Sequence, residues 1–406
     1  MKVLVVGSGG REHALAWKLA QSPALEHLHA APGNPGIAKI GECHPIRAED
    51  GESLLALART LPADLVVIGP EAPLVAGVAD ELRRGGVPVF GPSAGAARIE
   101  GSKTFAKDVM RAAGVPLAET MSVARAPCVV KADGLAAGKG VFVCRTQDDL
   151  DLALRAVAGL GDQFVIEELL EGEELSLFAL VDGARVLPLP ESRDYSRVGD
   201  GDTGPNTGGM GSYSPVPELD EAQIAELVGA VHRPVVEELA ARGAPFIGCL
   251  YAGLMLTPDG PRVLEFNCRF GDPETQTIVP RIDGDLAQAL SAAAMGDLSE
   301  VDLGVTDTAA VTVVLAAEGY PEARDAGSPI EGIEAAEADG ALVFHAGTAS
   351  RDGQLVTSGG RILNVTGLGE TLEEARVRAY DACERVSFPG ARYRRDIAAK
   401  AVNVAG

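Results

Sequence analysis

The sequence lacks paired cysteines. Its six cysteines include no C-x-x-C pair and stand singly in apolar stretches. This spacing excludes a cysteine-ligated zinc site and gives no sign of a disulfide framework. We therefore expect buried thiols in a reducing compartment.

Long apolar runs and basic tracts are also missing. The apolar run at residues 3–6 is too short for a signal peptide, and no segment approaches the length of a membrane span. The net charge of −23 argues against a nucleic-acid partner. A local basic pocket can still bind phosphates, because charges are screened beyond about 8 Å. We expect a cytoplasmic monomer with neither nucleic acid nor a membrane as partner.

The length of the chain predicts several domains, and its apolar pattern predicts that the first domain alternates strands and helices. At 406 residues the chain is too long for one ordinary core. Apolar runs at Val3–Val6, Leu65–Ile68 and Val87–Phe90 end in glycine turns, and helical patterns cover Glu12–Gln21 and Leu74–Arg84. This alternation is typical of a doubly wound parallel sheet, whose ligands bind beyond the carboxyl ends of the strands.

Three turns in this region suit anions. They read GSGGRE at residues 7–12, PGNPG at 32–36 and GPEAP at 69–73. The first opens a helix, whose N–H groups attract negative charge. It half-matches the dinucleotide fingerprint, but Glu12 stands in place of the third glycine and no acidic residue closes a second strand about twenty positions later. The pattern therefore disfavours NAD.

A strand, a glycine-rich loop and a second strand follow at residues 128–143, which read CVVKADGLAAGKGVFV. Glycines at 134, 138 and 140 allow close approach to phosphates and movement as a lid. Lys131 and Lys139 flank the loop as point charges for phosphate. The segment is not a Walker A loop, because no G-K-[ST] occurs and a strand follows. A plain β-hairpin with a flexible tip is the alternative.

Two later segments are candidates for ligand contact. Residues 164–174, FVIEELLEGEE, can present backbone groups to an adenine edge and a carboxylate to ribose, although a solvated acidic turn is the simpler interpretation. Residues 191–215 form a long loop rich in Gly, Asn and Thr, which we interpret as a substrate loop.

A metal site is predicted on a late strand. Glu265 and Asn267 are two apart and so share one face of the strand. Hard oxygen ligands at this spacing suit Mg²⁺, and Arg269 follows to neutralise phosphate charge. From Ala309 onward, further strands and a final helix beginning at the capping box of Thr371 predict a small α+β domain.

These features occur in the order of the ATP-grasp superfamily, which the chain resembles. In more detail it resembles the glycinamide ribonucleotide synthetase family almost end to end. The segments that carry this resemblance are GSGGREHA (7–14), GPEAPL (69–74), KADGLAAGKG (131–140), TGPNTGGMG (203–211), EFNCRFGDPE (265–274) and FHAGT (344–348).

The resemblance implies a multidomain protein of α/β and α+β parts. Residues 1–102 would form an N-terminal doubly wound α/β domain, and residues 103–122 with 186–305 the ATP-grasp core. Residues 123–185 would form a mobile lid subdomain, and residues 306–406 a C-terminal α+β domain.

The implied activity is an ATP-dependent ligase for purine synthesis. Glycine would be phosphorylated to glycyl phosphate and then joined to 5-phosphoribosylamine, giving glycinamide ribonucleotide, ADP and phosphate. An anion would attack a polyanion, so charge compensation would supply most of the catalysis. The resemblance assigns Mg²⁺ or Mn²⁺ to Glu265 and Asn267, and catalytic roles to Lys131, Lys139 and Arg269.

The remaining site residues also follow from the resemblance. The ATP contacts it implies are Lys103, Lys131, Gly138, Lys139, Glu167, Glu168, Leu170 and Glu174. The implied contacts with glycine and 5-phosphoribosylamine are Gly9, Gly10, Arg11, Glu12, Asn34, Pro70, Glu71, Asp194, Asp202, Asn206, Thr207, Gly208, Arg269 and Asp272.

The chain differs from the family pattern at two places, and two alternative functions stay open. At residues 193–197 the chain reads RDYSR, without the histidine and lysine that the family commonly has there. The strand before Glu265 carries no carboxylate, which leaves two protein ligands for the metal.

A sister ATP-grasp carboxylase or ligase would share the nucleotide site but not the 203–211 loop. A non-catalytic nucleotide-binding module would be expected to lack Lys131, Glu265 or Asn267.

Overall fold

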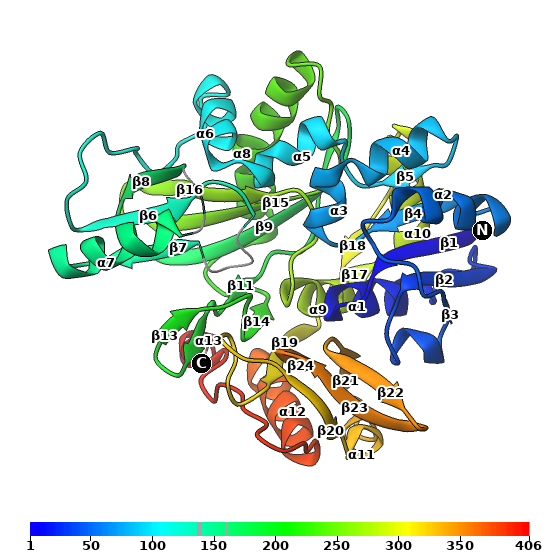
Figure 1. Cartoon of the computed structure of the whole chain (residues 1–406). Helices are drawn as coiled ribbons and strands as arrows, with labels where there is room; N and C mark the ends of the chain where they lie inside the picture. The colour runs from blue at the N-terminus through cyan, green and yellow to red at the C-terminus, as the bar shows by residue number, and fades with distance from the viewer. Residues whose placement is uncertain (136–139, 160, 162, 406) are drawn as a thin grey trace.

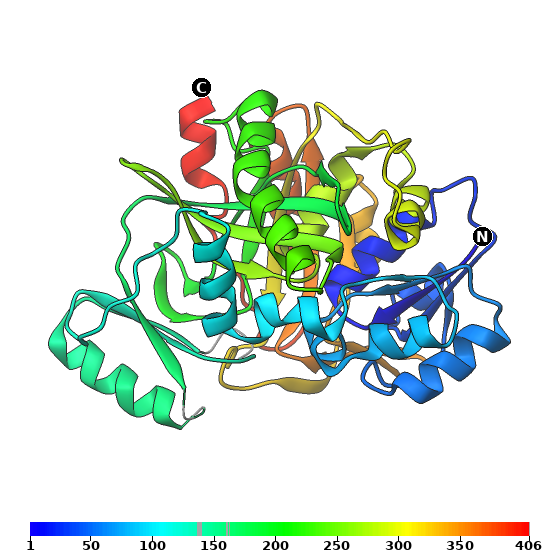
Figure 2. The same ribbon diagram turned by 90° about the horizontal axis from the view of Figure 1, so that it is seen from above.

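The computed structural model describes residues 1–135, 140–159, 161 and 163–405. Figures 1 and 2 show the N-terminal sheet at one end of the molecule and a small sheet with its helix at the other. The C-terminal part, orange to red in Figure 1, packs against the middle of the molecule. Within these ranges, no helix is long and apolar enough to cross a membrane.

The N-terminal sheet has the strand order β3-β2-β1-β4-β5, and each neighbouring pair is parallel. Its strands are β1 (Lys2–Gly7), β2 (His27–Pro32), β3 (Glu42–Cys43), β4 (Leu65–Ile68) and β5 (Val89–Phe90). The helices of this part are α1 (Gly10–Leu19), η1 (Ile37–Lys39), α2 (Gly51–Thr60), α3 (Glu71–Ala76), α4 (Val78–Arg84) and α5 (Ala94–Gly101). The prediction of a doubly wound parallel sheet is confirmed.

Alternate residues of β1 face different layers. Leu4 and Val6 pack in the apolar cluster that holds Leu54 of α2, whereas Val3 packs in the cluster that holds Leu15 of α1. Side chains alternate along a strand with period two, so helices cover both faces of the sheet. The turns just beyond β1, β2 and β4 are not covered by these helices and line the central cavity.

The middle sheet is antiparallel, with the order β10-β9-β15-β16. Its strands are β9 (Glu173–Asp182), β10 (Val186–Pro188), β15 (Ile247–Thr257) and β16 (Gly260–Asn267). Its helices are α6 (Lys103–Ala112), α8 (Glu221–Ala241) and α10 (Leu286–Met295). Leu177 and Val181 of β9 face the cluster with α8, and Phe178 and Leu180 face the cluster with α10. The sheet is therefore buried on both faces.

The small sheet has the order β7-β6-β8 and its own apolar cluster with α7. Its elements are β6 (Cys128–Ala132), β7 (Val141–Cys144), α7 (Gln147–Ala158) and β8 (Phe164–Glu168). The strands β6 and β7 are antiparallel on either side of the glycine-rich segment, as predicted. The predicted lid range 123–185 also includes β9, which the structure pairs with β15 in the middle sheet.

The C-terminal sheet has the order β11-β14-β19-β24-β21, and α12 packs on β19 and β24. Its elements are β11 (Arg193–Asp194), β14 (Gly211–Ser214), β19 (Ala309–Ala316), β21 (Leu342–His345), β24 (Arg361–Gly369) and α12 (Leu372–Arg385). The remaining elements are β12 (Arg197–Gly199), β13 (Thr203–Asn206), α9 (Glu274–Ile278), η2 (Val279–Arg281), β17 (Ile282–Asp283), β18 (Gly304–Val305), β20 (Asp325–Pro329), α11 (Ile333–Glu337), β22 (Thr348–Arg351), β23 (Gln354–Gly359) and α13 (Ala399–Ala405).

Three local predictions need correction. The pattern Leu74–Arg84 is not one helix, because Gly77 has φ +90° and separates α3 from α4. Residues 191–215 are not one irregular loop, since they contain the short strands β11, β12, β13 and β14. The helix capped by Thr371 is not the final one, because α13 follows.

The prediction of buried thiols is confirmed at five of the six cysteines. All six cysteines are free thiols, five are buried and Cys43 is half-buried.

Candidate active site

The middle of the molecule holds a cavity of about 1490 Å³, lined by residues from each sheet described above. Most of the residues singled out in the sequence meet on its wall. The predicted site residues that line it are Gly9, Arg11, Asn34, Pro70, Glu71, Lys103, Lys131, Glu167, Glu168, Leu170, Glu174, Asp194, Asp202, Asn206, Thr207, Gly208, Glu265, Asn267, Arg269 and Asp272. Gly10 and Glu12 lie behind this wall, and Gly138 and Lys139 fall outside the described residues.

The turn between β1 and α1 is filled by its own glutamate. The Gly9 N–H donates to Glu12 Oε2 at 2.6 Å, and Arg11 Nε lies 2.5 Å from Glu12 Oε1. A Cβ at Gly7 or Gly69 would overlap the Glu12 side chain. The position where a dinucleotide fold needs its third glycine therefore carries a buried carboxylate that orders both the turn and Arg11.

Asn34 joins the N-terminal turns to the C-terminal part. Its Nδ2 donates to the carbonyl oxygens of Ser8 and His345, each at 2.9 Å. Its Oδ1 accepts from the backbone N–H groups of Gly36 and Ile37, at 2.9 and 3.0 Å. Both ends of this buried amide are satisfied, so its main visible role is to fix the turn after β2.

Arg269 is held between two carboxylates. Its Nε lies 3.2 Å from Glu71 Oε2, and its Nη2 lies 2.8 Å from Glu100 Oε1. Burial opposes ionisation of Glu71, but Arg269 and Arg11 lower the pKa of this carboxyl to about 2. Burial instead raises the pKa of Glu100, although Arg269 counteracts it. The guanidinium is thus oriented on the cavity wall before any ligand enters.

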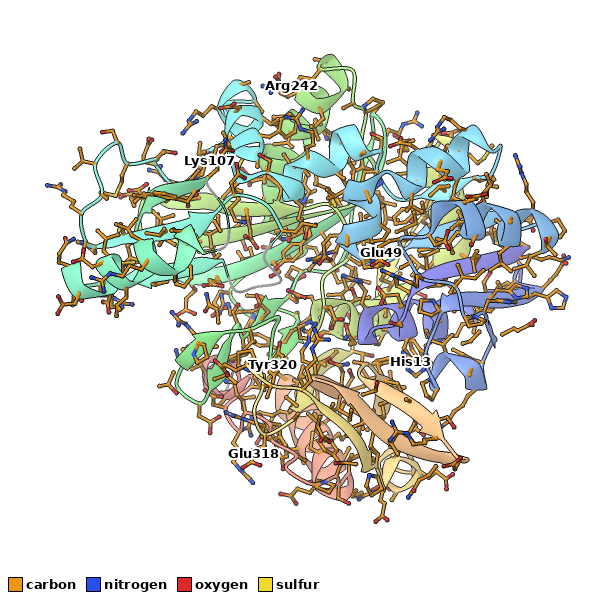
Figure 3. All side chains as sticks on the ribbon, viewed as in Figure 1. His13, Glu49, Lys107, Arg242, Glu318 and Tyr320 are labelled. Carbon is orange, nitrogen blue, oxygen red and sulfur yellow. The ribbon has the colours of Figure 1, made fainter. Side chains whose placement is uncertain are left out.

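Two buried lysines share one buried glutamate. Lys107 Nζ lies 2.8 Å from Glu167 Oε1, and Lys131 Nζ lies 2.9 Å from Glu167 Oε2. The lysines are 3% and 5% exposed and Glu167 is 2% exposed, so water screens this triad little. Burial lowers the pKa of Lys107. Lys107, labelled in Figure 3, was missed in the sequence, where only its spacing of four from Lys103 on a helix pointed to it.

Asp133 connects the helix α6 to the start of the glycine-rich segment. Its Oδ1 accepts from Lys103 N at 2.5 Å, and its Oδ2 accepts from Thr104 Oγ1 at 2.8 Å. Lys103 Nζ donates to Gly134 O at 3.3 Å. The predicted phosphate contact Lys103 is therefore tied to the part of the glycine-rich segment that the structure describes.

Four acidic side chains gather where the metal was predicted. Asn267 Nδ2 lies 3.5 Å from Glu265 Oε1, so β16 presents both side chains to the same space. Burial, followed by the charges of Asp194, Glu265 and Asp202, raises the pKa of Glu174 to about 7. Burial also raises the pKa of Asp194. Carboxylate and amide oxygens with too little positive charge among them suit a hard divalent cation, so this donor set fits Mg²⁺ or Mn²⁺.

A hydrogen-bonded chain of side chains runs along the floor of the cavity. Tyr251 Oη donates to Glu274 Oε1 at 3.0 Å and lies 3.0 Å from Ser176 Oγ, which donates to Asp194 Oδ1 at 3.3 Å. Glu274 Oε2 is buried without a hydrogen-bond partner among the described residues. Burial raises the pKa of Glu274 to about 7, and the negative charge of Asp194 is the next largest cause of this rise. Sequence reasoning noted Glu274 only as the end of a motif and missed Tyr251.

The C-terminal part closes the cavity on the side of the 203–211 segment. Gly208 N donates to Tyr320 Oη at 3.0 Å, and Arg361 Nη1 donates to Asp272 O at 2.6 Å. Arg361 Nη1 also donates to Gly208 O. Arg361 was missed in the sequence because nothing near it in the chain marks it. Tyr320 is labelled in Figure 3.

Comparisons with known proteins agree along the whole chain. Family models described as phosphoribosylglycinamide synthetase match here, the N domain at residues 1–100, the ATP-grasp (A) domain at 101–275 and the C domain at 310–400. The phosphoribosylamine–glycine ligase of Streptomyces coelicolor is 52% identical over 417 aligned positions, which cover 99% of each chain. The crystal structure of the enzyme of that name from Thermotoga maritima superposes with a TM-score of 0.84 at 37% identity, covering 98% of this chain and 100% of that one.

A more distant structure shares the fold alone. The biotin carboxylase domain of the 2-oxoglutarate carboxylase from Hydrogenobacter thermophilus superposes with a TM-score of 0.73 at 18% identity. That structure contains MgADP and bicarbonate.

Proposed function

The chain belongs to the phosphoribosylglycinamide synthetase family and is a phosphoribosylamine–glycine ligase, and from this premise we propose how its residues divide the reaction. The enzyme uses ATP to join glycine to 5-phosphoribosylamine through glycyl phosphate. The observation that carries our assignment is the single cavity on which Lys131, Glu265 and Arg269 meet.

We assign the part of the cavity between the small and middle sheets to ATP. Glu167, Glu168 and the backbone through Leu170 lie where β8 ends and would meet the adenine, with Glu174 near the ribose. Lys131 and Lys103 would contact the phosphates, together with Gly138 and Lys139. The small sheet would close over the phosphates as the lid of the predicted 123–185 subdomain. Closure would exclude water from glycyl phosphate, which water would otherwise hydrolyse.

We assign the divalent cation to Glu265 and Asn267. ATP-grasp enzymes use ATP with a divalent metal, and we propose Mg²⁺, with Mn²⁺ as a substitute. When bound, the cation would offset the negative charge of the phosphates. The side chains of Glu265 and Asn267 are already turned to one space by β16, so the protein supplies the position at little cost in ordering.

We assign the turns of the N-terminal sheet to 5-phosphoribosylamine. Gly9, Arg11, Asn34, Pro70 and Glu71 line this end of the cavity. The buried Gly10 and Glu12 would act from behind, because Glu12 holds the Gly9 N–H and Arg11 in place.

We assign glycine to the space between the 203–211 segment and Arg269. The wall there includes Asp194, Asp202, Asn206, Thr207, Gly208 and Asp272. The glycine carboxylate would attack the γ-phosphorus, and the amine of 5-phosphoribosylamine would then displace phosphate from glycyl phosphate. Both nucleophiles are already competent, so positioning and charge compensation would carry the catalysis.

We further propose that the enzyme works as a monomer in the cytoplasm. The free thiols of all six cysteines agree with a reducing compartment. Sedimentation equilibrium across a range of concentrations would test the monomer, and a mass that rises with concentration would contradict it.

The residue assignment is tested by ADP release with ATP, Mg²⁺ and glycine, with and without 5-phosphoribosylamine generated from ribose 5-phosphate and ammonia. We expect turnover to need both glycine and the amine. In Glu265→Gln we expect kcat/KM to fall by roughly 10²–10³-fold. The same variant should bind Mn²⁺ more weakly by electron paramagnetic resonance, a readout that needs no turnover. Unchanged Mn²⁺ affinity would remove Glu265 from the metal site.

A further inference from the structure

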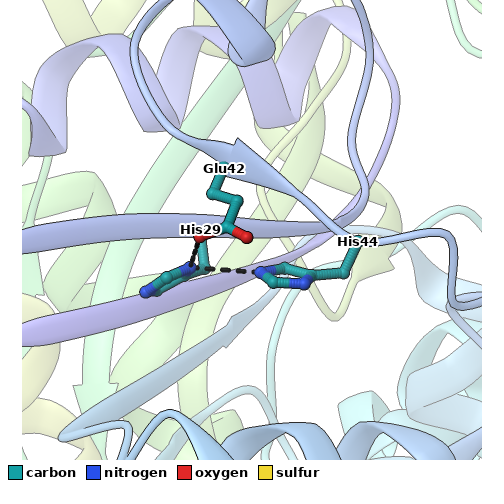
Figure 4. A group of neighbouring side chains, drawn as sticks. All are labelled: His29, Glu42 and His44. Carbon is teal, nitrogen blue, oxygen red and sulfur yellow. Dashed lines mark hydrogen bonds and ion pairs between the residues drawn. The ribbon is translucent and has the colours of Figure 1, made fainter.

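Three side chains outside the central cavity turn metal-ligating atoms toward one another. His29 lies on β2, Glu42 lies on β3 and His44 follows β3 directly. Figure 4 shows the two imidazole rings and the carboxylate facing a common space. One ligand atom from each residue lies within 4.8 Å of the other two.

The distances suit a tetrahedral ion. His29 Nδ1 lies 3.1 Å from His44 Nε2 and 3.6 Å from Glu42 Oε2. Zinc bound to nitrogen or carboxylate oxygen at its usual bond lengths places neighbouring ligand atoms about 3.3–3.4 Å apart in a tetrahedron. Both separations are within a few tenths of an ångström of this value, and the third, between His44 and Glu42, is within 4.8 Å. Rotation of the exposed Glu42 side chain would adjust the third separation.

The backbone holds the three residues in this arrangement. His29 and Glu42 are direct partners in the parallel pairing of β2 with β3, and His44 N donates to Ala30 O at 2.8 Å. His29 is 8% exposed, so its ring has little freedom to turn away. The His29 ring is therefore ordered before an ion arrives, which lowers the entropy that binding must overcome, whereas the Glu42 side chain, 69% exposed, would be ordered by the ion.

We propose that His29, Glu42 and His44 form a site for a borderline divalent metal ion such as Zn²⁺, with water as the fourth ligand. Imidazole suits zinc and disfavours magnesium, so this site is chemically distinct from the one at Glu265 and Asn267. Cys43 takes no part, because its Sγ donates to Asn34 O at 3.8 Å, in the turn after β2.

A bound ion would cross-link β3 at the edge of the sheet to β2. Two residues past β2 stands Asn34, the amide that fixes the turn at the substrate end of the cavity. The proposed ion would therefore stabilise the part of the N-terminal sheet that leads into this turn, without touching the cavity itself.

The competing explanation is a hydrogen-bonded histidine pair beside a glutamate with no affinity for metal. To separate the two, Zn²⁺ is titrated into chelator-treated enzyme against a chromophoric zinc chelator, with excess Mg²⁺ to occupy the carboxylates of the cavity. We expect one equivalent to bind in the wild type. His29→Gln and His44→Gln should each weaken this binding at least about tenfold.

The matched control is His27→Gln, because His27 lies on the same strand but is exposed and outside the cluster. It should bind Zn²⁺ as the wild type does. Absence of stoichiometric binding in the wild type, or equal affinity in His44→Gln and His27→Gln, would overturn the proposal.

A second measurement guards against misfolded variants. Co²⁺ in a tetrahedral site absorbs strongly in the visible range, and we expect this absorption in the wild type and its loss in His44→Gln. Ligase turnover with Mg²⁺ should persist in His44→Gln, since His44 does not line the cavity. Zn²⁺ should raise the thermal midpoint of the wild type but not of this variant. Octahedral Co²⁺ absorption alone, or an equal midpoint shift in both proteins, would contradict the site.

Discussion

At the scale of single residues, the cavity is defined by buried charges that depend on one another. Glu167 is the only carboxylate that the described residues place in ion-pair contact with Lys107 and Lys131. Removing one member of a buried pair leaves the other charge desolvated, which costs far more than losing a surface pair.

Glu167→Gln should therefore destabilise the enzyme by about 3–5 kcal/mol, because two ammonium groups would remain buried without a counter-charge. The measurement is the urea midpoint and slope of the ligand-free protein. Glu171→Gln is the control, since Glu171 is exposed on the same acidic segment and should change stability little. Equal midpoints for the two variants would show that solvent reaches the lysines.

Glu274 should make stability depend on pH in the metal-free enzyme. The pKa of Glu274 rises from 4.5 to about 7 on folding, because burial favours the protonated side chain. The stability that this protonation contributes is fully present below pH 4.5 and is lost as the pH rises through 7. Relative to Glu274→Gln, the wild type should lose up to about 3 kcal/mol across this window. Thermal midpoints measured from pH 5 to 8 give the difference. The control is Glu226→Gln, at an exposed position of α8, whose midpoints should follow those of the wild type. A difference in midpoint between the wild type and Glu274→Gln that stays constant with pH would refute the raised pKa of Glu274.

The sequence could identify residues whose role is fixed by local spacing. Glu265 and Asn267 share a face because the period of a strand is two, and the structure turns both into the cavity. It could not identify Glu100, which contacts Arg269 from 169 positions away. Tyr251 and Arg361 were missed for the same reason, since their partners are supplied by other elements.

At the scale of elements, one side chain, that of Glu12, packs against both the turn after β1 and the turn after β4. The Glu12 side chain lies against Gly7 and Gly69, and neither position has room for a Cβ. Two elements that are far apart in the sequence are thus fitted around one carboxylate.

Gly69→Ala should displace Glu12, costing about 1–3 kcal/mol of stability and raising the KM for 5-phosphoribosylamine with little effect on that for ATP. Gly229→Ala is the matched control, because Gly229 lies within α8 with nothing near its added Cβ. That change should stabilise the protein by about 0.5–1 kcal/mol. Steady-state kinetics with each substrate varied would check the prediction, and an equal rise in both KM values would contradict it.

Apolar periodicity predicted several strands, among them β1 and β4, and the helix α1, but not the interruptions of such patterns. Leu74–Arg84 has a continuous helical pattern, yet Gly77 adopts a left-handed conformation that ends α3. Residues 191–215 look irregular in composition, and they form strands because β11 and β14 pair within the C-terminal sheet. Such pairing is a tertiary effect that composition does not report.

At the scale of the whole molecule, two buried histidines join the first helix to the C-terminal sheet. His13 on α1 (Figure 3) accepts at Nδ1 from the His345 N–H at 2.8 Å, and the rings meet edge to face at 5.5 Å. Burial lowers the pKa of His13 to about 3 and that of His345 to about 4. Both rings are therefore neutral in the folded protein at neutral pH.

Acid should weaken this junction. A histidine whose pKa is lowered on folding contributes stability above its unfolded value of 6.5, and this is lost as the pH falls toward 4. His13→Asn keeps an acceptor but cannot be protonated, so its thermal midpoint should fall less between pH 7 and 4.5 than that of the wild type. His27→Gln, at an exposed position, should follow the wild type. Parallel curves for all three proteins would show that the junction does not titrate.

The cavity wall includes residues from Ser8 to Lys400, so segments almost 400 positions apart in the chain must come together to form it. A chain in which the segment around Lys400 has not yet left the ribosome therefore lacks part of the wall. Nascent chains, and products that terminate early, should then be unable to spend ATP on glycine. The capacity to make an acyl phosphate is thus acquired only after the segment around Lys400 has joined the rest of the wall.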